Sequence, residues 1–382
     1  MLKKLVNPSR WGGGISLLWR GNTFKDYIYA LNKPTVISQN FHSLYPFDSA
    51  RNALFHFMKS IGIKKGDVVQ VMYYTCDAVT DVLLDLECDI KFYDCDSNFK
   101  SIDFELDKNC KLLISQITFG REAHSEMELQ EIAKKGVQIV IDKSLSYGPK
   151  DFSKDAQFNF PTLVSFEVSK SITFGWAGLL ILPNPHMFIS YYNLLKKVGW
   201  LRDIYRNMTS LLNLYFIQNG GTFKFFGWAI LKVLMFHRAS SKSSSSYSRN
   251  HSKLGFFSLR VFYGFFDSIQ AKLEISNKNH DYIANLLKSY SVKVNSEVNE
   301  VMSSPRVHFS LPNNTRLEFI NFMKENKIEV GSWFNSPPIN LEKNLVNANS
   351  LFLESVNLSC HWSLRDHEIE HIKRCINNFF EK

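Results

Sequence analysis

Several short stretches of the sequence place residues capable of chemistry beside apolar runs. Residues 165–182 read SFEVSKSITFGWAGLLIL, with Ser165 at the start and Lys170 as the one lysine before a glycine-punctuated apolar run. A lysine in a dry cleft can lose its proton and form a Schiff base. A lysine in water is an ordinary surface charge. The stretch is therefore either a nucleophilic site or a solvated turn.

Two further stretches admit the same pair of interpretations. Ser49, Ala50 and Arg51 open an apolar periodic segment that predicts a helix, and a helix N-terminus can hold a phosphate. Ser49 can equally be a simple N-cap. Asp142 follows the apolar run VQIVI, where an acid can pair with a positive ring nitrogen or serve as a turn residue. The stretch IEVGSWFNSPPIN is by itself only a turn rich in Gly and Pro.

The elements that must position these residues alternate between helix and strand from residue 49 to about 182. Helical spacing marks 50–63, 78–87 and 126–136, and apolar runs predict strands at 68–74, 90–96, 111–118, 137–142, 162–168 and 178–183. This alternation predicts an α/β fold with a mostly parallel sheet and helices on both faces. Ligands of such sheets bind beyond the carboxyl ends of the strands, where Asp142, Ser165 and Lys170 are expected.

The length of the chain predicts two domains, or one large domain plus a smaller one. We expect a large domain over 1–255 and a smaller α+β domain over 256–382 of the 382 residues. The large domain includes an aromatic and basic insertion at about 186–237 and a serine-rich loop at 239–254. The net charge of +9 favours acidic partners such as nucleotides, phosphates or an anionic membrane face. Since no basic run is dense enough for a nucleic-acid arm, we predict no nucleic-acid partner.

The cysteines and the N-terminal sequence predict a cytoplasmic protein. The six cysteines contain no CxxC pair and are expected to be reduced thiols, with no metal site. The N-terminal lysines lack the apolar segment of a signal peptide, and no apolar run reaches about 18 residues, so we predict no transmembrane helix.

The order of these stretches resembles the DegT/StrS-type sugar aminotransferases, which belong to the fold-type I enzymes that use pyridoxal 5′-phosphate (PLP). The resemblance covers most of residues 45–185 and 255–375. It rests on SARNAL, GDVVQV, Tyr74-Thr75-Cys76, Phe119-Gly120, DKSLSYG, SFEVSK, SIQAKL, IEVGSWF and NLSCHWSLRDHEIEHI. Each match is degenerate, but their common order is specific for the fold.

The resemblance implies a role for each candidate residue. Lys170 would form the Schiff base with PLP and move the substrate proton. Asp142 would keep the pyridine nitrogen protonated. Ser165, with the backbone of Ala50 and Arg51 after Ser49, would hold the phosphate.

The reaction implied is a transamination from an amino acid, typically glutamate, to a keto-sugar that is usually nucleotide-linked. Its products serve cell-surface glycan or lipopolysaccharide biosynthesis. The family is homodimeric, and the partner subunit completes each active site. Dehydratase relatives carry histidine in place of the lysine, so Lys170 argues against that chemistry.

Departures from the family pattern leave an alternative open. Cys76 stands where an aromatic residue often stacks on the cofactor, Leu145 where Gln or His is common, and Lys143 beside Asp142. Trp176 lies in the turn after Lys170, and SLRVFYGFF replaces an Asn-Tyr-Arg segment. The alternative is a PLP-fold protein with altered or lost catalysis that acts in regulation or membrane-associated assembly. The insertion at 186–237 is then a peripheral membrane contact, or else a helical subdomain packed on the protein itself.

Overall fold

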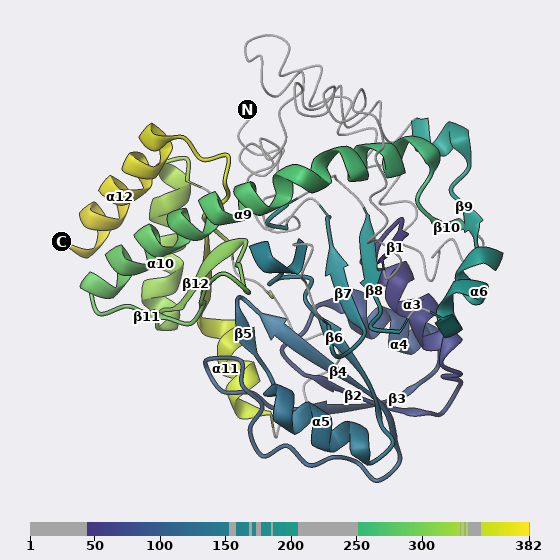
Figure 1. The fold of residues 1–382 in the computed structure, drawn as a ribbon. Helices are drawn as coiled ribbons and strands as arrows, with labels where there is room; N and C mark the ends of the chain where they lie inside the picture. Colours follow the sequence, from purple (N-terminus) through teal and green to yellow (C-terminus); the bar gives the residue numbers. More distant parts are fainter. Residues whose placement is uncertain are drawn as a thin grey trace, which may run out of the picture.

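The large domain is built on one mixed, mostly parallel sheet (Figure 1). The computed structural model describes residues 44–152, 158–167, 170–172, 177–184, 186–204, 251–328, 330–331, 334 and 345–381. Within them the strand order is β3 (Asp89–Tyr93), β2 (Val68–Met72), β4 (Cys110–Thr118), β6 (Gln138–Asp142), β7 (Thr162–Ser165), β8 (Gly178–Ile181), β1 (Leu44–Phe47), β10 (His251–Lys253) and β9 (Lys196–Lys197). The neighbouring pairs β3–β2, β2–β4, β4–β6 and β6–β7 are parallel, and β8 is antiparallel to both of its neighbours. The predicted fold class is confirmed.

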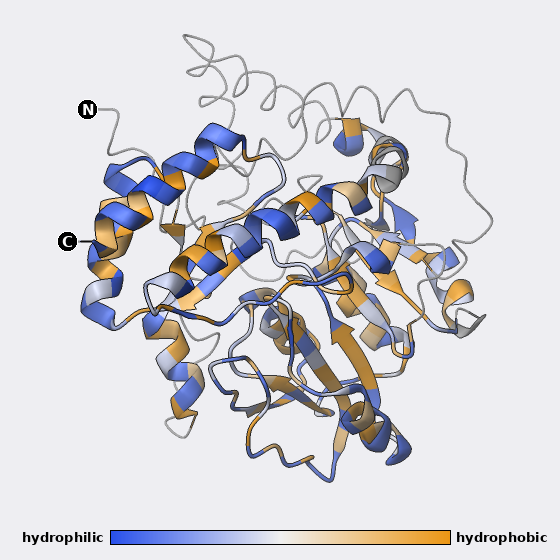
Figure 2. Ribbon diagram, turned by 60° about the vertical axis from the view of Figure 1, so that its left-hand side comes forward, coloured by the Kyte–Doolittle hydropathy of each residue, from blue (hydrophilic) through white to orange (hydrophobic). Residues whose placement is uncertain are grey.

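Helices cover both faces of this sheet because its central strands are apolar on both sides. Along β4, Leu113 and Ile117 belong to one core and Leu112 and Ile114 to the other, as the alternation of side chains in a strand requires. The first core lies under α5 (Glu126–Lys134) and the second under α3 (Ala50–Ser60) and α4 (Asp77–Asp85). The hydropathy colours of Figure 2 show apolar strands enclosed by helices with polar outer surfaces. Two short elements complete the list, β5 (Arg121–Glu122) and η4 (Pro149–Phe152).

The smaller domain is an antiparallel sheet with helices on one side. The strand order is β11 (Lys293–Val294), β12 (Arg306–Ser310), β14 (Ser355–Ser359) and β13 (Val330–Gly331). The helices α10 (Asn313–Glu325) and α12 (Asp366–Phe380) pack on this side, whereas α11 (Val346–Glu354), which precedes β14, buries Ala348, Leu351 and Phe352 in the large-domain core. Val307, Phe309, Val356 and Leu358 form the apolar face, which packs on helices in a separate core. The other face of the sheet is polar and buried.

The helix α9 (Phe256–Ser289) belongs to both domains (Figure 1). Its first half packs on the large domain through Phe262 and Ile269, and its last turns enter the small-domain core through Ile283 and Leu287. The segment SLRVFYGFF lies in this helix. The domain boundary at residue 255 stays a prediction.

Parts of three predictions lie outside the described residues. These parts are residues 205–250 of the insertion and serine-rich loop, Trp176, and most of IEVGSWFNSPPIN. Residues 186–194 of the insertion form α6. Of the helices that the structure describes, none combines the length and hydropathy needed to cross a bilayer. In the same residues, His, Cys, Asp and Glu side chains do not gather into a group that could hold a metal ion.

Candidate cofactor-binding site

The N-terminus of α3 is held against the start of β8. The Ser49 Oγ accepts a hydrogen bond of 3.2 Å from the backbone N–H of Asn52, so Ser49 is the N-cap of α3. A Cβ atom at Gly178 would lie 2.1 Å from the backbone nitrogen of Ala50, so only glycine fits there. The Arg51 guanidinium is half exposed and lies 3.7 Å from the Asp81 carboxylate. Residues 50 and 51 can therefore reach an anion through their backbone rather than through the arginine side chain.

Asp142 and Ser165 end two adjacent parallel strands. Asp142 pairs with Leu163 of β7, and it is 9% exposed. Its Oδ1 accepts 2.9 Å from the backbone N–H of Ser144, so it also shapes the turn. Ser165 is 5% exposed, and its Oγ lies 3.5 Å from the backbone nitrogen of Glu167. Both side chains therefore lie at the carboxyl edge of the sheet, as predicted.

Lys170 is buried in the turn that follows β7. It is 8% exposed, so it is not the solvated surface charge of the alternative interpretation. The turn is fixed by Tyr147, whose hydroxyl accepts 2.8 Å from the backbone N–H of Ile172 and donates 2.9 Å to its carbonyl. Tyr147 belongs to the same segment as Asp142, so one side chain connects the acid-bearing turn to the lysine-bearing turn. Sequence reasoning quoted Tyr147 within DKSLSYG but gave it no role.

Cys76 lies close to Lys170. It is the N-cap residue of α4 and lies in the turn between β2 and α4. Burial raises the pKa of the Cys76 thiol, and the nearby Lys170 charge opposes this rise. The preceding Thr75 accepts a 2.6 Å hydrogen bond from the Gln116 amide. The β2–α4 turn therefore lies beside the Lys170 turn, and Cys76 supplies a thiol there rather than a ring.

The two departures near Asp142 have a structural explanation. The Lys143 amine lies 2.7 Å from the Asp151 carboxylate, and both side chains are at most one-tenth exposed. Burial raises the pKa of Asp151, and Lys143 opposes that shift. The Lys143 charge is thus neutralised by a partner of its own. Leu145 is buried in the apolar core and offers no hydrogen bond.

The small domain closes the site from the other side. His361 is 1% exposed, and its pKa is lowered to about 3 by burial and by the Lys272 and Arg306 charges, against an opposing contribution of the Ser171 backbone. His361 therefore lies beside the residue that follows Lys170. Sequence reasoning quoted this histidine only within a family motif, because no local pattern shows which turn it meets.

Two glycines bring the domains together. A Cβ at Gly120 would lie 1.6 Å from the Glu297 carbonyl oxygen, and one at Gly148 would lie 2.2 Å from the Val301 backbone. The backbone N–H of Glu297 donates 2.8 Å to the Phe119 carbonyl. These contacts position the small-domain sheet over the carboxyl edge of the large sheet.

The comparisons with known proteins concern the fold. A scan against models of protein families and a search of curated protein sequences each found no match. Among solved structures, a DegT/DnrJ/EryC1/StrS aminotransferase from Brucella abortus is 16% identical, with a TM-score of 0.62 over 89% of this chain and 86% of that one. A protein described as a sugar aminotransferase from Streptococcus pneumoniae, in the pyridoxamine phosphate (PMP) form, is 13% identical, with a TM-score of 0.69 over 94% and 97%.

The chain has the fold of the DegT/DnrJ/EryC1/StrS aminotransferases. A third solved structure, NtdA of Bacillus subtilis with bound PMP, is 12% identical, with a TM-score of 0.64 over 96% of this chain and 84% of that one. The predicted architecture is therefore confirmed. The roles of Lys170, Asp142, Ser165, Cys76, Leu145 and residues 49–51 stay predictions.

The residues at this edge of the DegT-type fold fit PLP. The coenzyme carries an aldehyde, a pyridine nitrogen and a phosphate, which call for an amine, an acid and a set of N–H and hydroxyl donors. The site provides a buried lysine, a buried aspartate on the neighbouring strand, and a helix N-terminus close to Ser165.

Proposed function

We propose that the protein is a PLP-dependent aminotransferase that moves an amino group from an amino acid to a keto-sugar. The observation that carries this proposal is the burial of Lys170 in the turn after β7, in a DegT-type fold. Strand β7 is the neighbour of β6, which ends at Asp142. Bound PLP supplies an electron sink for chemistry at the carbon that bears the amino group.

Each candidate site residue then has a distinct role. Lys170 binds the coenzyme covalently and carries a proton to and from the substrate. Asp142 keeps a proton on the ring nitrogen. Because Asp142 is buried, the attraction between its carboxylate and the protonated nitrogen is less screened by water. The backbone N–H groups of residues 50 and 51, with Ser165, bind the phosphate. Tyr147 holds the lysine turn in place.

The finer parts of the proposal follow the family. The amino donor is glutamate, and the acceptor is a nucleotide-linked keto-sugar used for cell-surface glycan or lipopolysaccharide biosynthesis. The working form is a cytoplasmic homodimer whose subunits share their active sites. The net charge of +9 and the Lys272 and Arg306 side chains near His361 support an anionic substrate.

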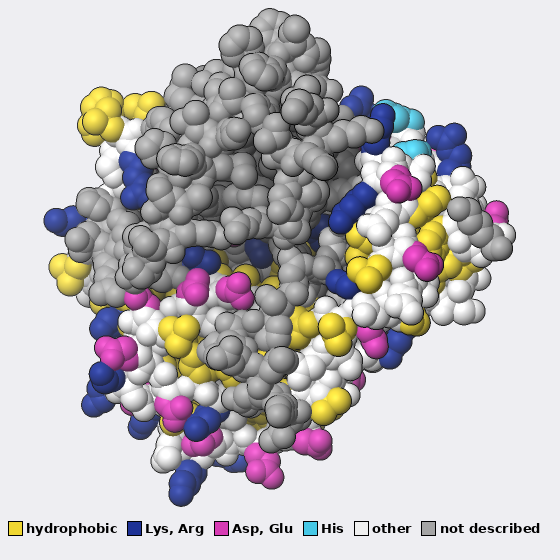
Figure 3. Space-filling view, turned by 180° about the vertical axis from the view of Figure 1, so that it is seen from behind, with side chains coloured by type: hydrophobic (Ala, Val, Ile, Leu, Met, Phe, Trp, Pro, Cys, Tyr) yellow, Lys and Arg dark blue, Asp and Glu magenta, His cyan; other side chains and the backbone are white. Residues whose placement is uncertain are grey.

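A second candidate is a protein of this fold with altered catalysis that binds a membrane surface. It is favoured by Cys76 and Leu145, at positions where the family resemblance expects cofactor-binding side chains, and by exposed apolar side chains beside lysines near α6. Leu194 is 83% exposed and Trp200 is 66% exposed, while Lys196 and Lys197 are exposed between them. Figure 3 shows hydrophobic and basic side chains together along the edge that contains α6 and β9. Such a surface suits peripheral contact with an anionic membrane.

Titration of the purified protein with PLP tests the proposal. We expect a yellow complex that borohydride fixes, with the modified peptide containing Lys170, and no fixed colour in Lys170→Ala. Glutamate should convert the complex to the amine form, and one nucleotide-linked keto-sugar should restore the colour. Failure to bind PLP would overturn the proposal. Binding without conversion by any amino donor would favour the second candidate.

A further inference from the structure

The surface around β9 combines exposed apolar side chains with lysines. Leu194 is 83% exposed, and Trp200 and Leu201 are each 66% exposed. Between them in the sequence, Lys196 and Lys197 form β9 at the edge of the large sheet, and both are exposed. These five residues are called the β9 surface below. A single exposed leucine is ordinary, but a group of large apolar side chains with a polar rim is typical of a contact site.

The exposed charges of this segment have one sign. Asp203 is the one acidic residue in the sequence between positions 186 and 204. It is 1% exposed, and its carboxylate accepts hydrogen bonds from the backbone N–H and the hydroxyl of Ser258 in α9. Asp203 therefore caps a helix in the interior, and the lysines of the β9 surface and the exposed Arg202 are not neutralised by an acid of their own segment.

A third lysine adds to the positive charge. Strand β10 pairs with β9 so that Lys253 lies beside Lys197. Burial and the Lys197 charge lower the pKa of Lys253. The Lys253 amine lies 4.5 Å from the centre of the Tyr192 ring and donates 3.3 Å to the Asn193 carbonyl. Like charges on adjacent strands repel each other, and an anionic partner would offset this repulsion.

The sequence that follows this surface has the same character. From residue 204 to 266 it contains lysines, arginines and many aromatic residues, but no Asp or Glu. The net charge of +9 is therefore concentrated in one part of the chain and not spread evenly over it. Such an asymmetry is typical of a protein that meets an anionic surface.

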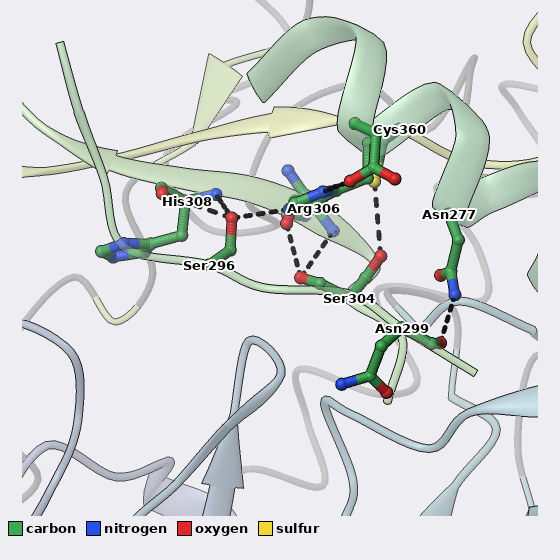
Figure 4. A network of polar contacts seen from close by, with 9 residues as sticks. Asn277, Ser296, Asn299, Ser304, Arg306, His308 and Cys360 are labelled. Atoms are coloured by element: carbon green, nitrogen blue, oxygen red, sulfur yellow. Dashed lines mark hydrogen bonds and ion pairs between the residues drawn. The ribbon is translucent and has the colours of Figure 1, made fainter. Parts of the chain in front are cut away.

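The polar layer between the two domains offers no comparable surface. The Ser304 hydroxyl donates to the Arg306 carbonyl, and the Cys360 thiol donates 3.3 Å to the Ser304 carbonyl. Figure 4 shows these contacts along β12. Arg306 is 1% exposed, so this layer is closed to solvent and serves to hold the protein together. The β9 surface is open to solvent.

An anionic bilayer fits the β9 surface better than a second copy or a nucleic acid. In a symmetric dimer the same positive patch would lie on both sides of the contact, where the lysines repel each other. A nucleic acid would bind the lysines but leave Leu194 and Leu201 without apolar contacts. At an anionic bilayer, Trp and Leu side chains enter the headgroup region while lysines bind the lipid phosphates.

We infer that the β9 surface docks the protein on an anionic phospholipid bilayer. Its three apolar side chains enter the headgroup region, and its two lysines bind lipid phosphates. Docking adds a partner to the proposed aminotransferase and requires no loss of catalysis, unlike the second candidate function. Strand β10 pairs with β1 at Phe47, two residues before Ser49, so docking holds the candidate cofactor site close to the bilayer.

Vesicle binding of the PLP-loaded protein tests the inference. Sedimentation would compare vesicles of phosphatidylglycerol and phosphatidylcholine in equal parts with vesicles of phosphatidylcholine alone. We expect the wild type to bind the anionic vesicles about 10-fold more tightly or better. The double variant Lys196→Gln, Lys197→Gln should weaken this binding about 20-fold, and Leu201→Ser should weaken it about 10-fold.

The matched controls lie on the side of the molecule opposite β9 in Figure 1. The double variant Lys288→Gln, Lys324→Gln removes the same charge from exposed positions. Leu353→Ser removes a leucine that is 59% exposed, close to the exposure of Leu201. Both controls should bind vesicles as the wild type does. Because all the altered side chains are exposed, melting temperatures should stay close to that of the wild type.

Absent binding, or equal binding to both kinds of vesicle, overturns the inference, and so does wild-type binding by either β9-surface variant. A change of oligomeric state in Leu201→Ser, measured by light scattering, would make the surface a subunit contact instead. Tighter binding to a single-stranded DNA oligomer than to vesicles would make it a nucleic-acid site.

The yellow colour of bound PLP is read separately in the same samples. A colourless protein that still binds anionic vesicles overturns the proposed aminotransferase and leaves the docking surface in place. A yellow protein that ignores the vesicles overturns the docking alone.

Discussion

Tyr147 gives the sharpest test of how the lysine turn is held. Its hydroxyl is the partner of both the N–H and the carbonyl of Ile172, two residues after Lys170, and its ring is fully buried. The variant Tyr147→Phe keeps the ring and removes only the hydroxyl. Both backbone groups of Ile172 are then left buried without these bonds.

The size of the effect follows from those two groups. A buried polar group left unpaired costs about 1–3 kcal/mol. Because the turn can relax, we expect the free energy of unfolding to fall by about 2–4 kcal/mol, towards the lower part of the summed range. The looser turn should also release PLP faster, since Lys170 lies within it.

Urea unfolding of the apoprotein, followed by circular dichroism, measures the first effect, and the decay of the yellow colour after dilution measures the second. The matched control is Tyr290→Phe, whose hydroxyl donates 2.7 Å to an exposed Glu381 and should leave both quantities unchanged. A Tyr147→Phe protein with the wild-type unfolding midpoint and the wild-type rate of PLP release would refute the account of the turn.

Three further predictions concern other parts of the molecule. Gly178→Ala places a methyl group 2.1 Å from the Ala50 nitrogen, so the α3 N-terminus must shift, and we expect PLP affinity to fall about 10-fold or more in a spectral titration. Lys143→Ala leaves the Asp151 carboxylate buried without its cation and should lower the unfolding free energy by about 3–5 kcal/mol, while Lys143→Ala with Asp151→Ala should recover part of the loss; equal losses in both would contradict a buried pair. Burial lowers the His124 pKa to about 4. Between pH 6.5 and 4 the unfolded chain therefore takes up a proton that the folded chain does not, and the free energy of unfolding decreases as the pH is lowered through that window. His124→Gln should make the free energy of unfolding, measured by urea titration between pH 7 and 5, less pH-dependent by about 1 kcal/mol per pH unit, and an unchanged dependence would contradict this.

The sequence predicted the large domain well because its order follows local patterns. Buried runs such as residues 138–142 become parallel strands, and the residues after them lie at one edge of the sheet wherever helices connect the strands. Asp142, Ser165 and Lys170 could therefore be selected before their surroundings were known. The charge of Lys143 could not be assigned a direction, because its partner Asp151 lies in a short helix that no periodicity marks.

The residues that sequence reasoning missed act through contacts between distant segments. Tyr147 meets Ile172 across two turns, and His361 meets Ser171 across the two domains. Gly178 matters because another backbone comes within van der Waals distance, which a single sequence does not show.

The helix α9 restricts how the two domains can move. Its 34 residues span about 50 Å as one continuous rod, anchored in the large domain at one end and in the small domain at the other. A hinge at this junction would have to bend or unwind a helix and break its backbone hydrogen bonds. An incoming molecule is therefore admitted by movement of the turns and loops around the site, while α9 holds the two domains in a fixed relative position.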